Sequence, residues 1–192
     1  MLIKNKKISI VGQGYVGLPL TIELGKRYKN IIGFDNSINR ISEIRKKIDK
    51  NKEISRSDFL KAKNVTFTSN KSDLSKSDFF IITVPTPLNS KKEPDLKSLI
   101  NATKLVAKNL KKKSIIIYES TVYPGCTEEV CVPILEKHSH LKFNKDFFCG
   151  YSPERINVGD KVNTIENIIK IVSGSTPKIS EILKKMYQKI LS

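Results

Sequence analysis

The sequence is poor in the residues that build metal centres and disulfide frameworks. Its two histidines, His138 and His140, have no carboxylate or thiol beside them at a spacing familiar from metal sites. Its three cysteines, Cys126, Cys131 and Cys149, make an odd number without a C-x-x-C pair. We therefore predict no metal, surface histidines, and reduced, partly buried thiols.

Long apolar runs are also missing. No stretch approaches the roughly 20 apolar residues that a membrane-spanning helix needs. The N-terminal segment MLIKNKKISIV lacks the apolar core and the small-residue cleavage site of a signal peptide. We expect a cytoplasmic protein without a membrane partner, whose 192 residues form one large domain.

Acidic residues are scarce beside basic ones. The chain has 19 Asp and Glu against 35 Lys and Arg, which gives a net charge of +16. Such a charge alone would favour a nucleic-acid partner. The lysines are scattered through helical segments without interleaved aromatic residues, however, which is typical of a solvated surface. We predict no nucleic-acid partner and keep nucleic-acid binding as the weakest alternative.

What the sequence does contain is a glycine-rich turn within ISIVGQGYVG, residues 8–17. A β-branched run breaks into glycines at the spacing G-x-G-x-x-G, and a helical period with Pro19 in its first turn follows. Gly12 permits a tight turn, Gly14 lets the backbone approach a pyrophosphate, and Gly17 lets the helix pack closely. The helix N-terminus offers free N–H groups to phosphates. Alone the pattern is weak, because glycine-rich turns also serve plain packing.

A carboxylate at the expected distance strengthens this interpretation. The apolar run at residues 31–34 ends at Asp35, about 20 residues beyond the glycines, where a carboxylate accepts hydrogen bonds from an adenosine ribose. The same charge repels a 2′-phosphate, so the predicted cofactor is NAD. Two alternatives stay open: Asp35 could cap the helix before Ser37, and Arg40 could accept a 2′-phosphate.

Strand and helix periods alternate along the chain. They predict an α/β fold, a doubly wound and mostly parallel Rossmann sheet in three α/β/α layers with the order 3-2-1-4-5-6. We expect strands at residues 8–11, 31–34, 65–68, 78–84, 114–120, 147–151 and 167–172. We expect helices from residue 18 and over residues 37–48, 95–110, 125–136 and 176–190, with a charged connector at 49–62. Pro133 should kink or end the helix that contains it.

Three polar loops follow strands that end at the same edge of this sheet. They are VPTP at residues 84–87, ESTVYPG at 119–125 and SPERIN at 152–157. Each loop taken singly has the composition of an ordinary turn. Their convergence indicates a ligand site.

Five segments together resemble the N-terminal half of the UDP-glucose/GDP-mannose dehydrogenase family. They are GQGYVGLPL, FDNSINRI, VPTPLNSKKEPDL, YESTVYPGCTEEVCVPILE and GYSPERINVGDK. The nearest resemblance is to the bacterial branch that oxidises UDP-N-acetylhexosamines to uronic acids for capsule and O-antigen synthesis. It implies a four-electron oxidation of the sugar C6 alcohol with two NAD⁺, in which a cysteine thiolate captures the intermediate aldehyde.

The resemblance also implies roles for particular residues. Thr121 would position the alcohol or a catalytic water, and Glu154 would assist proton transfer or thioester hydrolysis. The implied cofactor contacts are Gly12, Gly14, Tyr15, Val16, Gly17, Asp35, Arg40, Val84, Thr86, Ser120 and Thr121. The implied contacts with the nucleotide-sugar substrate are Glu154, Arg155 and Asn157.

Two departures from the family pattern matter. Val158 stands where many members have a second glutamate and the N-acetylhexosamine branch commonly has proline. The catalytic cysteine, its lysine and asparagine partners, the central dimerisation helix and the UDP-binding domain are expected beyond residue 192. We therefore expect residues 1–192 to be a single NAD-binding domain without turnover of its own, from a full-length homodimer. The alternative is a non-catalytic module or gene remnant that needs a separate C-terminal polypeptide.

Overall fold

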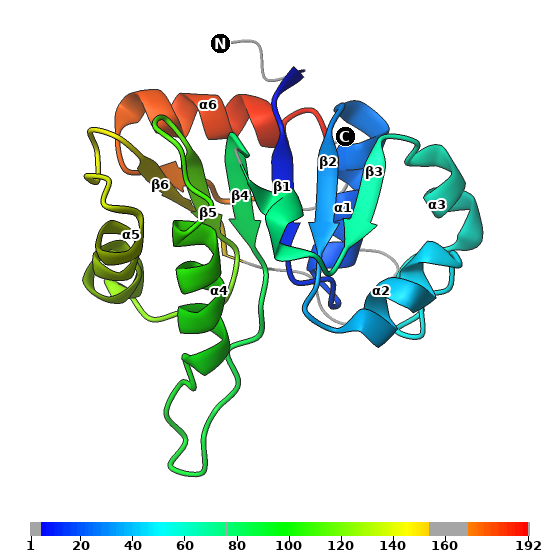
Figure 1. Ribbon diagram of the computed structural model, residues 1–192, viewed down its shortest axis with the longest axis horizontal. Coiled ribbons are helices and arrows are strands. Elements are labelled where there is room, and N and C mark those ends of the chain that lie inside the picture. Colours follow the sequence, from blue (N-terminus) through cyan, green and yellow to red (C-terminus); the bar gives the residue numbers. More distant parts are fainter. Residues whose placement is uncertain (1–4, 76, 154–168, 192) are drawn as a thin grey trace.

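The computed structural model describes residues 5–75, 77–153 and 169–191 of the chain. These residues form one seven-stranded sheet in the order β3-β2-β1-β4-β5-β6-β7 (Figure 1). The first six strands run parallel, and β7 pairs antiparallel with β6. The strands are β1 (Ile8–Val11), β2 (Ile31–Phe34), β3 (Val65–Thr68), β4 (Phe79–Ile82), β5 (Ile115–Tyr118), β6 (Phe148–Tyr151) and β7 (Ser173–Gly174). The predicted doubly wound order is confirmed.

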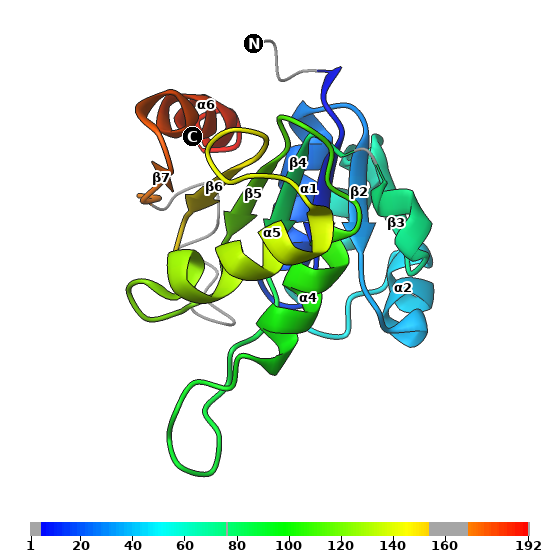
Figure 2. The ribbon, with the colours of Figure 1, turned by 60° about the vertical axis from the view of Figure 1, so that its left-hand side comes forward.

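Helices cover both faces of the sheet, which confirms the three α/β/α layers. Helices α1 and α6 pack on one face, and α4 and α5 pack on the other (Figure 2). The helices are α1 (Gly17–Arg27), α2 (Ile38–Arg45), α3 (Arg56–Lys61), α4 (Lys97–Ala107), α5 (Val132–Ser139) and α6 (Pro177–Tyr187), with a 3₁₀ turn η2 (Lys71–Leu74) and a π-helical turn η3 (Thr127–Cys131).

Side chains of the central strands alternate between two apolar cores. Ile8 and Ile10 of β1 pack with α1 and α6, whereas Phe80 and Ile82 of β4 pack with α4 and α5. All four have no exposed surface. Because helices cover both faces of a parallel sheet, its central strands are mostly apolar. Ligands can therefore reach the sheet only at the ends of its strands.

The charged connector expected at residues 49–62 is wrong in part, because α3 forms there. Ser55 caps this helix by accepting a hydrogen bond from the Asp58 backbone N–H at 3.2 Å. Phe59 then packs against Leu18 and Ile22 of α1. One buried aromatic residue on a short charged helix gives no periodic signal, so the apolar pattern did not reveal it.

Helix α2 is shorter than expected. Ile41 and Ile44 are buried, but Ile38 is 72% exposed and Ile48 is 51% exposed. The helix ends at Arg45, and Lys47 adopts a positive φ of 60°, so the chain turns before Ile48. The spacing of Ile38, Ile41, Ile44 and Ile48 predicts one apolar helical face, but only Ile41 and Ile44 are buried in the structure.

Of the two outcomes expected at Pro133, a kink or an end of the helix, the end is wrong. The π-helical turn η3 passes directly into α5, which continues to Ser139. Pro133 lies at the start of α5, and the Val132 N–H donates to the Thr127 carbonyl five residues earlier. The wider π turn moves the preceding carbonyl groups away from the proline ring, which removes the usual clash.

The last strand is shifted from the expected position. Residues 169–172 lie outside any strand, residues 167 and 168 lie outside the described chain, and the pairing with β6 begins at Ser173. The expected start of α6 is confirmed, because the Ile179 N–H donates to Thr176 Oγ1 at 3.3 Å and Pro177 opens the helix. Nowhere in the described ranges is a helix long and apolar enough to cross a membrane.

Candidate functional site

The glycine-rich turn lies between β1 and α1, where the sequence predicts it. Gly12 has a φ of +101°, in the left-handed region that favours glycine. A methyl group added to Gly17 would lie 1.9 Å from the Gly12 carbonyl oxygen and 2.4 Å from Thr83 Oγ1. A methyl group added to Gly14 would meet no atom within 4 Å. The turn is thus tightly packed at Gly12 and Gly17 and open at Gly14.

The N-terminus of α1 faces this open position without a protein cap. Val16 at the N-cap supplies no side-chain hydrogen bond, and the first turn of the helix contains no acidic residue. The positive end of the helix dipole favours an anion there. Tyr15 is exposed and Val16 half-buried beside it. The residues present therefore fit a diphosphate.

Asp35 lies at the end of β2, directly beside the turn. One oxygen, Oδ2, accepts the Gln13 N–H at 2.8 Å, and the other, Oδ1, accepts the Ser37 N–H at 2.9 Å. Ser37, and not Asp35, caps α2, because the Arg40 N–H donates to Ser37 Oγ at 3.2 Å. The capping interpretation of Asp35 is therefore wrong. Each carboxylate oxygen retains a lone pair for a further donor.

Arg40 contacts the turn from the first turn of α2. Its Nε donates to the Gln13 carbonyl oxygen at 2.8 Å. Its Nη1 donates to Glu43 Oε1 at 2.7 Å, and its Nη2 lies 2.8 Å from Asp49 Oδ1. Arg40 is absent from the lining of the neighbouring cavity. Its predicted role as a cofactor contact stays a prediction, and the structure adds a contact with the turn itself.

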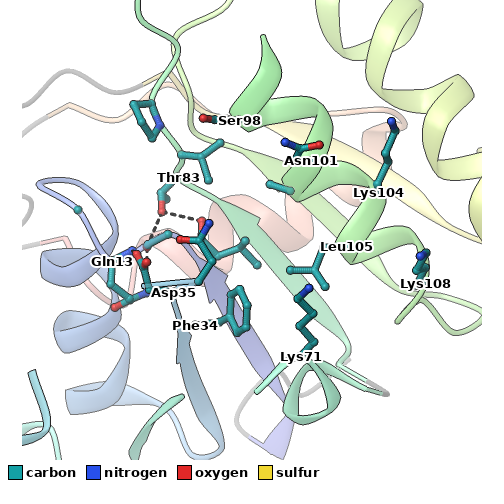
Figure 3. Close-up of a pocket in the computed structure, with 17 residues that line it drawn as sticks. Gln13, Phe34, Asp35, Lys71, Thr83, Ser98, Asn101, Lys104, Leu105 and Lys108 are labelled. Atoms are coloured by element: carbon teal, nitrogen blue, oxygen red, sulfur yellow. Dashed lines mark hydrogen bonds between the residues drawn. The ribbon is translucent and has the colours of Figure 1, made fainter. Parts of the chain in front are cut away.

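A cavity of about 670 Å³ opens beside the turn at the carboxyl ends of β1, β2 and β4 (Figure 3). Gly12, Gln13, Gly14 and Asp35 line one wall. The opposite wall is polar and belongs to α4 and η2, with Ser98, Asn101, Lys104, Lys108 and Lys71. This cavity spans the point where the strand order reverses between β1 and β4, which is where open α/β sheets bind ligands.

The loops after β4 and β5 are joined by hydrogen bonds. Thr86 Oγ1 donates to the Thr121 carbonyl oxygen at 2.5 Å, and Ser120 Oγ donates to the Val84 carbonyl oxygen at 2.5 Å. The side chain of Thr121 stays exposed at this edge. Two of the three predicted loops are therefore brought together, and four of the predicted residues lie at their junction.

The third loop is described only at its start. The Ser152 N–H donates to the Tyr118 carbonyl oxygen at 3.0 Å, so the loop leaves the sheet beside the end of β5. The predicted residues Glu154, Arg155 and Asn157, together with Val158, lie outside the described residues.

Two residues that support the turn were missed by the sequence reasoning: Thr83, which follows β4, and Gln13 within the turn. The Thr83 hydroxyl donates toward the Val11 and Gly12 carbonyl oxygens at 3.2 and 3.0 Å. Gln13 is fully buried, and its amide Nε2 donates to the carbonyl oxygens of Ile10 at 3.2 Å and Gly12 at 2.9 Å. Both brace the turn from within. The sequence offered one signal for both residues: Gln13 and Thr83 are polar, and each follows an apolar strand closely.

A buried charged network lies under the β5 loop and was also missed. Lys170 Nζ lies 2.8 Å from Glu119 Oε2, and neither side chain is exposed. The Tyr187 hydroxyl donates to the other oxygen of Glu119. Nothing in the local sequence pairs residue 119 with residue 170, because their contact depends on how β5 and the chain before β7 meet.

The three thiols are buried and unsuited to nucleophilic chemistry. Burial raises the pKa of Cys131 to about 11, and it also raises the pKa of Cys126 and of Cys149. All three are free, as predicted. Among the described residues, no group of three His, Cys, Asp or Glu side chains could hold a metal ion.

An open glycine turn before an uncapped helix, a carboxylate at the end of β2 and a cavity at the reversal point define a dinucleotide-binding Rossmann domain. Residues 6–191 match the sequence profile of the UDP-glucose/GDP-mannose dehydrogenase family, NAD binding domain. The chain belongs to this family, and its cofactor is NAD.

Individual relatives agree with this assignment. Over 99% of its length, the chain is 50% identical to UDP-N-acetyl-D-glucosamine 6-dehydrogenase of Pseudomonas aeruginosa, covering 45% of that protein. Over 98% of its length, it is 49% identical to Protein CapL of Staphylococcus aureus, covering 44%. The crystal structure of NDP-N-acetyl-D-galactosaminuronic acid dehydrogenase from Methanosarcina mazei Go1 superposes with a TM-score of 0.89 at 29% identity, covering 98% of this chain and 42% of that one. The chain thus spans less than half the length of these relatives.

Proposed function

We propose that this chain is the NAD-binding part of a nucleotide-sugar 6-dehydrogenase. The whole protein would oxidise the C6 alcohol of a UDP-N-acetylhexosamine to the uronic acid with two NAD⁺. The observation that carries the proposal is the open, uncapped turn facing Asp35, in a chain that is 50% identical to a UDP-N-acetyl-D-glucosamine 6-dehydrogenase. Surface polysaccharide synthesis, such as that of capsule or O-antigen, is the corresponding role.

Each part of the described site has a task in this proposal. The turn at Gly14 and the N-terminus of α1 would hold the diphosphate, and Asp35 would accept hydrogen bonds from the adenosine ribose. When bound, NAD⁺ supplies the acceptor for the hydride that leaves the sugar C6. The junction of the β4 and β5 loops would place the exposed Thr121 side chain toward the alcohol or a catalytic water. Glu154 would assist proton transfer or thioester hydrolysis.

The proposed chemistry needs a thiolate that this domain does not offer. A thiol captures an aldehyde as its thiolate, and burial raises the pKa of each of the three cysteines here. We propose that the thiol, the UDP-binding part and the dimerisation helix belong to the portion of the relatives that this chain does not match. The domain by itself would bind NAD⁺ without turnover, and the whole protein would act as a cytoplasmic homodimer without a nucleic-acid or membrane partner.

Titration calorimetry with NAD⁺ and NADP⁺ tests the cofactor site. We expect NAD⁺ to bind and NADP⁺ to bind more weakly, because Asp35 repels a 2′-phosphate. Binding of neither nucleotide, or a clear preference for NADP⁺, would refute the assignment. In a parallel assay, NADH production from a UDP-N-acetylhexosamine by the chain alone would refute the absence of turnover.

A second candidate is a non-catalytic cofactor-binding module or gene remnant that works only with a separate C-terminal polypeptide. This second candidate is retained because all three thiols are buried, so the chain itself offers no accessible catalytic thiol. The coding sequence downstream of residue 192 separates the two. A cysteine-bearing second half, in frame or adjacent, supports the dehydrogenase, and its absence supports the remnant.

A further inference from the structure

The backbone of Gln13, in the middle of the glycine turn, is held by two charged side chains. Its N–H donates to Asp35 Oδ2 at 2.8 Å, and its carbonyl oxygen accepts from Arg40 Nε at 2.8 Å. Both side chains belong to the segment that follows β2. Hydrogen bonds to charged groups are roughly twice as strong as neutral ones, so this clamp fixes the turn against β2 and α2.

The other two nitrogens of the Arg40 guanidinium are committed to acids. Nη1 donates to Glu43 Oε1 at 2.7 Å, and Nη2 lies 2.8 Å from Asp49 Oδ1. The side chains of Arg40, Glu43 and Asp49 are 14%, 12% and 0% exposed, respectively. Asp49 is itself fixed, because Oδ2 accepts the backbone N–H of Glu53 at 2.9 Å. The arginine therefore has little freedom to turn toward a ligand.

Charge reinforces this arrangement. Two carboxylates, those of Glu43 and Asp49, contact the guanidinium, and a third, that of Asp35, holds the same turn through the Gln13 N–H. Glu43 also pairs with Lys50, whose Nζ lies 3.8 Å from Glu43 Oε2 and whose side chain is 81% exposed. The lysines that line the cavity belong to η2 and α4, and Figure 3 shows Lys104 and Lys108 on the wall across from Asp35. Lys71 on η2 also lines the cavity that Asp35 lines, so the proposal concerns Arg40 alone and not every cation near the site.

We propose that Arg40 is a positioning and specificity-determining residue: its pairing with Glu43 and Asp49 holds the turn for NAD⁺ and withholds the guanidinium from a 2′-phosphate. The inference rests on the proposed NAD site and extends it, because it assigns the discrimination between cofactors to a charge network. An arginine near the end of β2 ordinarily favours NADP. Here the ion pairs with Glu43 and Asp49 keep Arg40 from attracting the 2′-phosphate.

The test removes one acid and measures both cofactors by titration calorimetry. Glu43→Gln keeps an acceptor for the Lys50 N–H but weakens the hold on Arg40. We expect the NADP⁺ affinity to rise at least about fivefold relative to NAD⁺, because a released guanidinium binds phosphate strongly. The double variant Arg40→Gln with Glu43→Gln should lose this gain. An unchanged cofactor ratio in Glu43→Gln, or a gain that survives in the double variant, would overturn the inference.

Arg40→Gln alone tests the positioning role, and Arg45→Gln is its matched control. Arg45 also lies on α2 and donates to a backbone carbonyl, that of Phe67 at 3.0 and 2.8 Å, but it does not touch the turn. We expect Arg40→Gln to weaken NAD⁺ binding about tenfold and Arg45→Gln to leave it unchanged. Equal effects of the two variants would contradict the positioning role. Thermal unfolding without ligand reports whether each variant folds, and failure of the unmodified chain to bind NAD⁺ would refute the site itself.

Discussion

At the residue scale, Gly14 and Gly17 serve the same turn for different reasons. Gly14 faces open space, so a methyl group there would occupy the region proposed for the diphosphate. Gly17 faces the Gly12 carbonyl, so a methyl group there would collide with the backbone itself. One glycine is therefore required by the ligand and the other by the fold.

Alanine at each position separates these requirements. We expect Gly14→Ala to retain the stability of the unmodified chain and to lose at least about tenfold in NAD⁺ affinity. We expect Gly17→Ala to lower the free energy of unfolding by about 1–3 kcal/mol, because overpacking forces the backbone apart. Urea unfolding and calorimetry measure both quantities. Tight NAD⁺ binding by Gly14→Ala would contradict the proposed position of the diphosphate.

Asp78 predicts how stability depends on pH. Burial by itself would raise its pKa, but hydrogen bonds from the Lys7 N–H and from the Lys111 and Lys6 ammonium groups lower the pKa below its ordinary value. A depressed folded-state pKa adds stability above the unfolded-state pKa of about 3.9, and this stability is lost as pH falls through the folded-state value. We expect Asp78→Asn to be less stable than the unmodified chain at pH 7. The difference should narrow as the pH falls below 4, as urea unfolding at both pH values would show, and a constant difference would contradict the assignment.

At the scale of elements, the network of Lys170, Glu119 and Tyr187 joins β5 to α6 and to the chain that precedes β7. Glu119 directly precedes Ser120 and Thr121 of the proposed site. Lys170 Nζ also lies 5.3 Å from the centre of the Tyr187 ring. The network therefore connects the loop of the proposed site to α6, which packs on a face of the sheet.

Removing the lysine should weaken this connection strongly. We expect Lys170→Met to lower the free energy of unfolding by about 3–5 kcal/mol, because it breaks a buried ion pair with Glu119. Lys185→Met is the matched control: the Lys185–Glu181 pair on α6 is exposed, with 3.2 Å between Nζ and Oε1, and its loss should cost less than about 1 kcal/mol. Equal losses in the two variants, measured by urea unfolding, would contradict the role of burial.

At the scale of the whole molecule, the thiols report global unfolding. Cys126, Cys131 and Cys149 all belong to the core formed with α4 and α5. We expect the folded protein to resist Ellman's reagent at pH 8, because burial excludes the reagent and raises each pKa. In guanidinium chloride, all three thiols should react. Rapid reaction of one thiol in the folded protein would show that this thiol is accessible, and it would contradict the conclusion that none of the three can act as a nucleophile.

Much of the fold follows from local patterns in the sequence. The predicted strand at residues 65–68 is confirmed residue for residue as β3, and the Thr176–Pro177 start of α6 is also confirmed. These signals succeed because β-branched runs and capping residues act over a few neighbours. Three predictions were wrong for the converse reason. The existence of α3, the exposure of Ile38 and the position of β7 each depend on which neighbouring element covers that segment.

The sequence by itself determined that this protein has a dinucleotide turn, a carboxylate beside it and polar loops at one edge of a parallel sheet. Glycine spacing and strand order carry that information, because they constrain the backbone locally and through the right-handed crossover. Only the tertiary structure decided that Arg40 is bound by Glu43 and Asp49, that Glu119 pairs with Lys170, and that the thiols, predicted to be partly buried, are almost completely buried. Charge pairing and burial depend on distances between segments that no local pattern encodes.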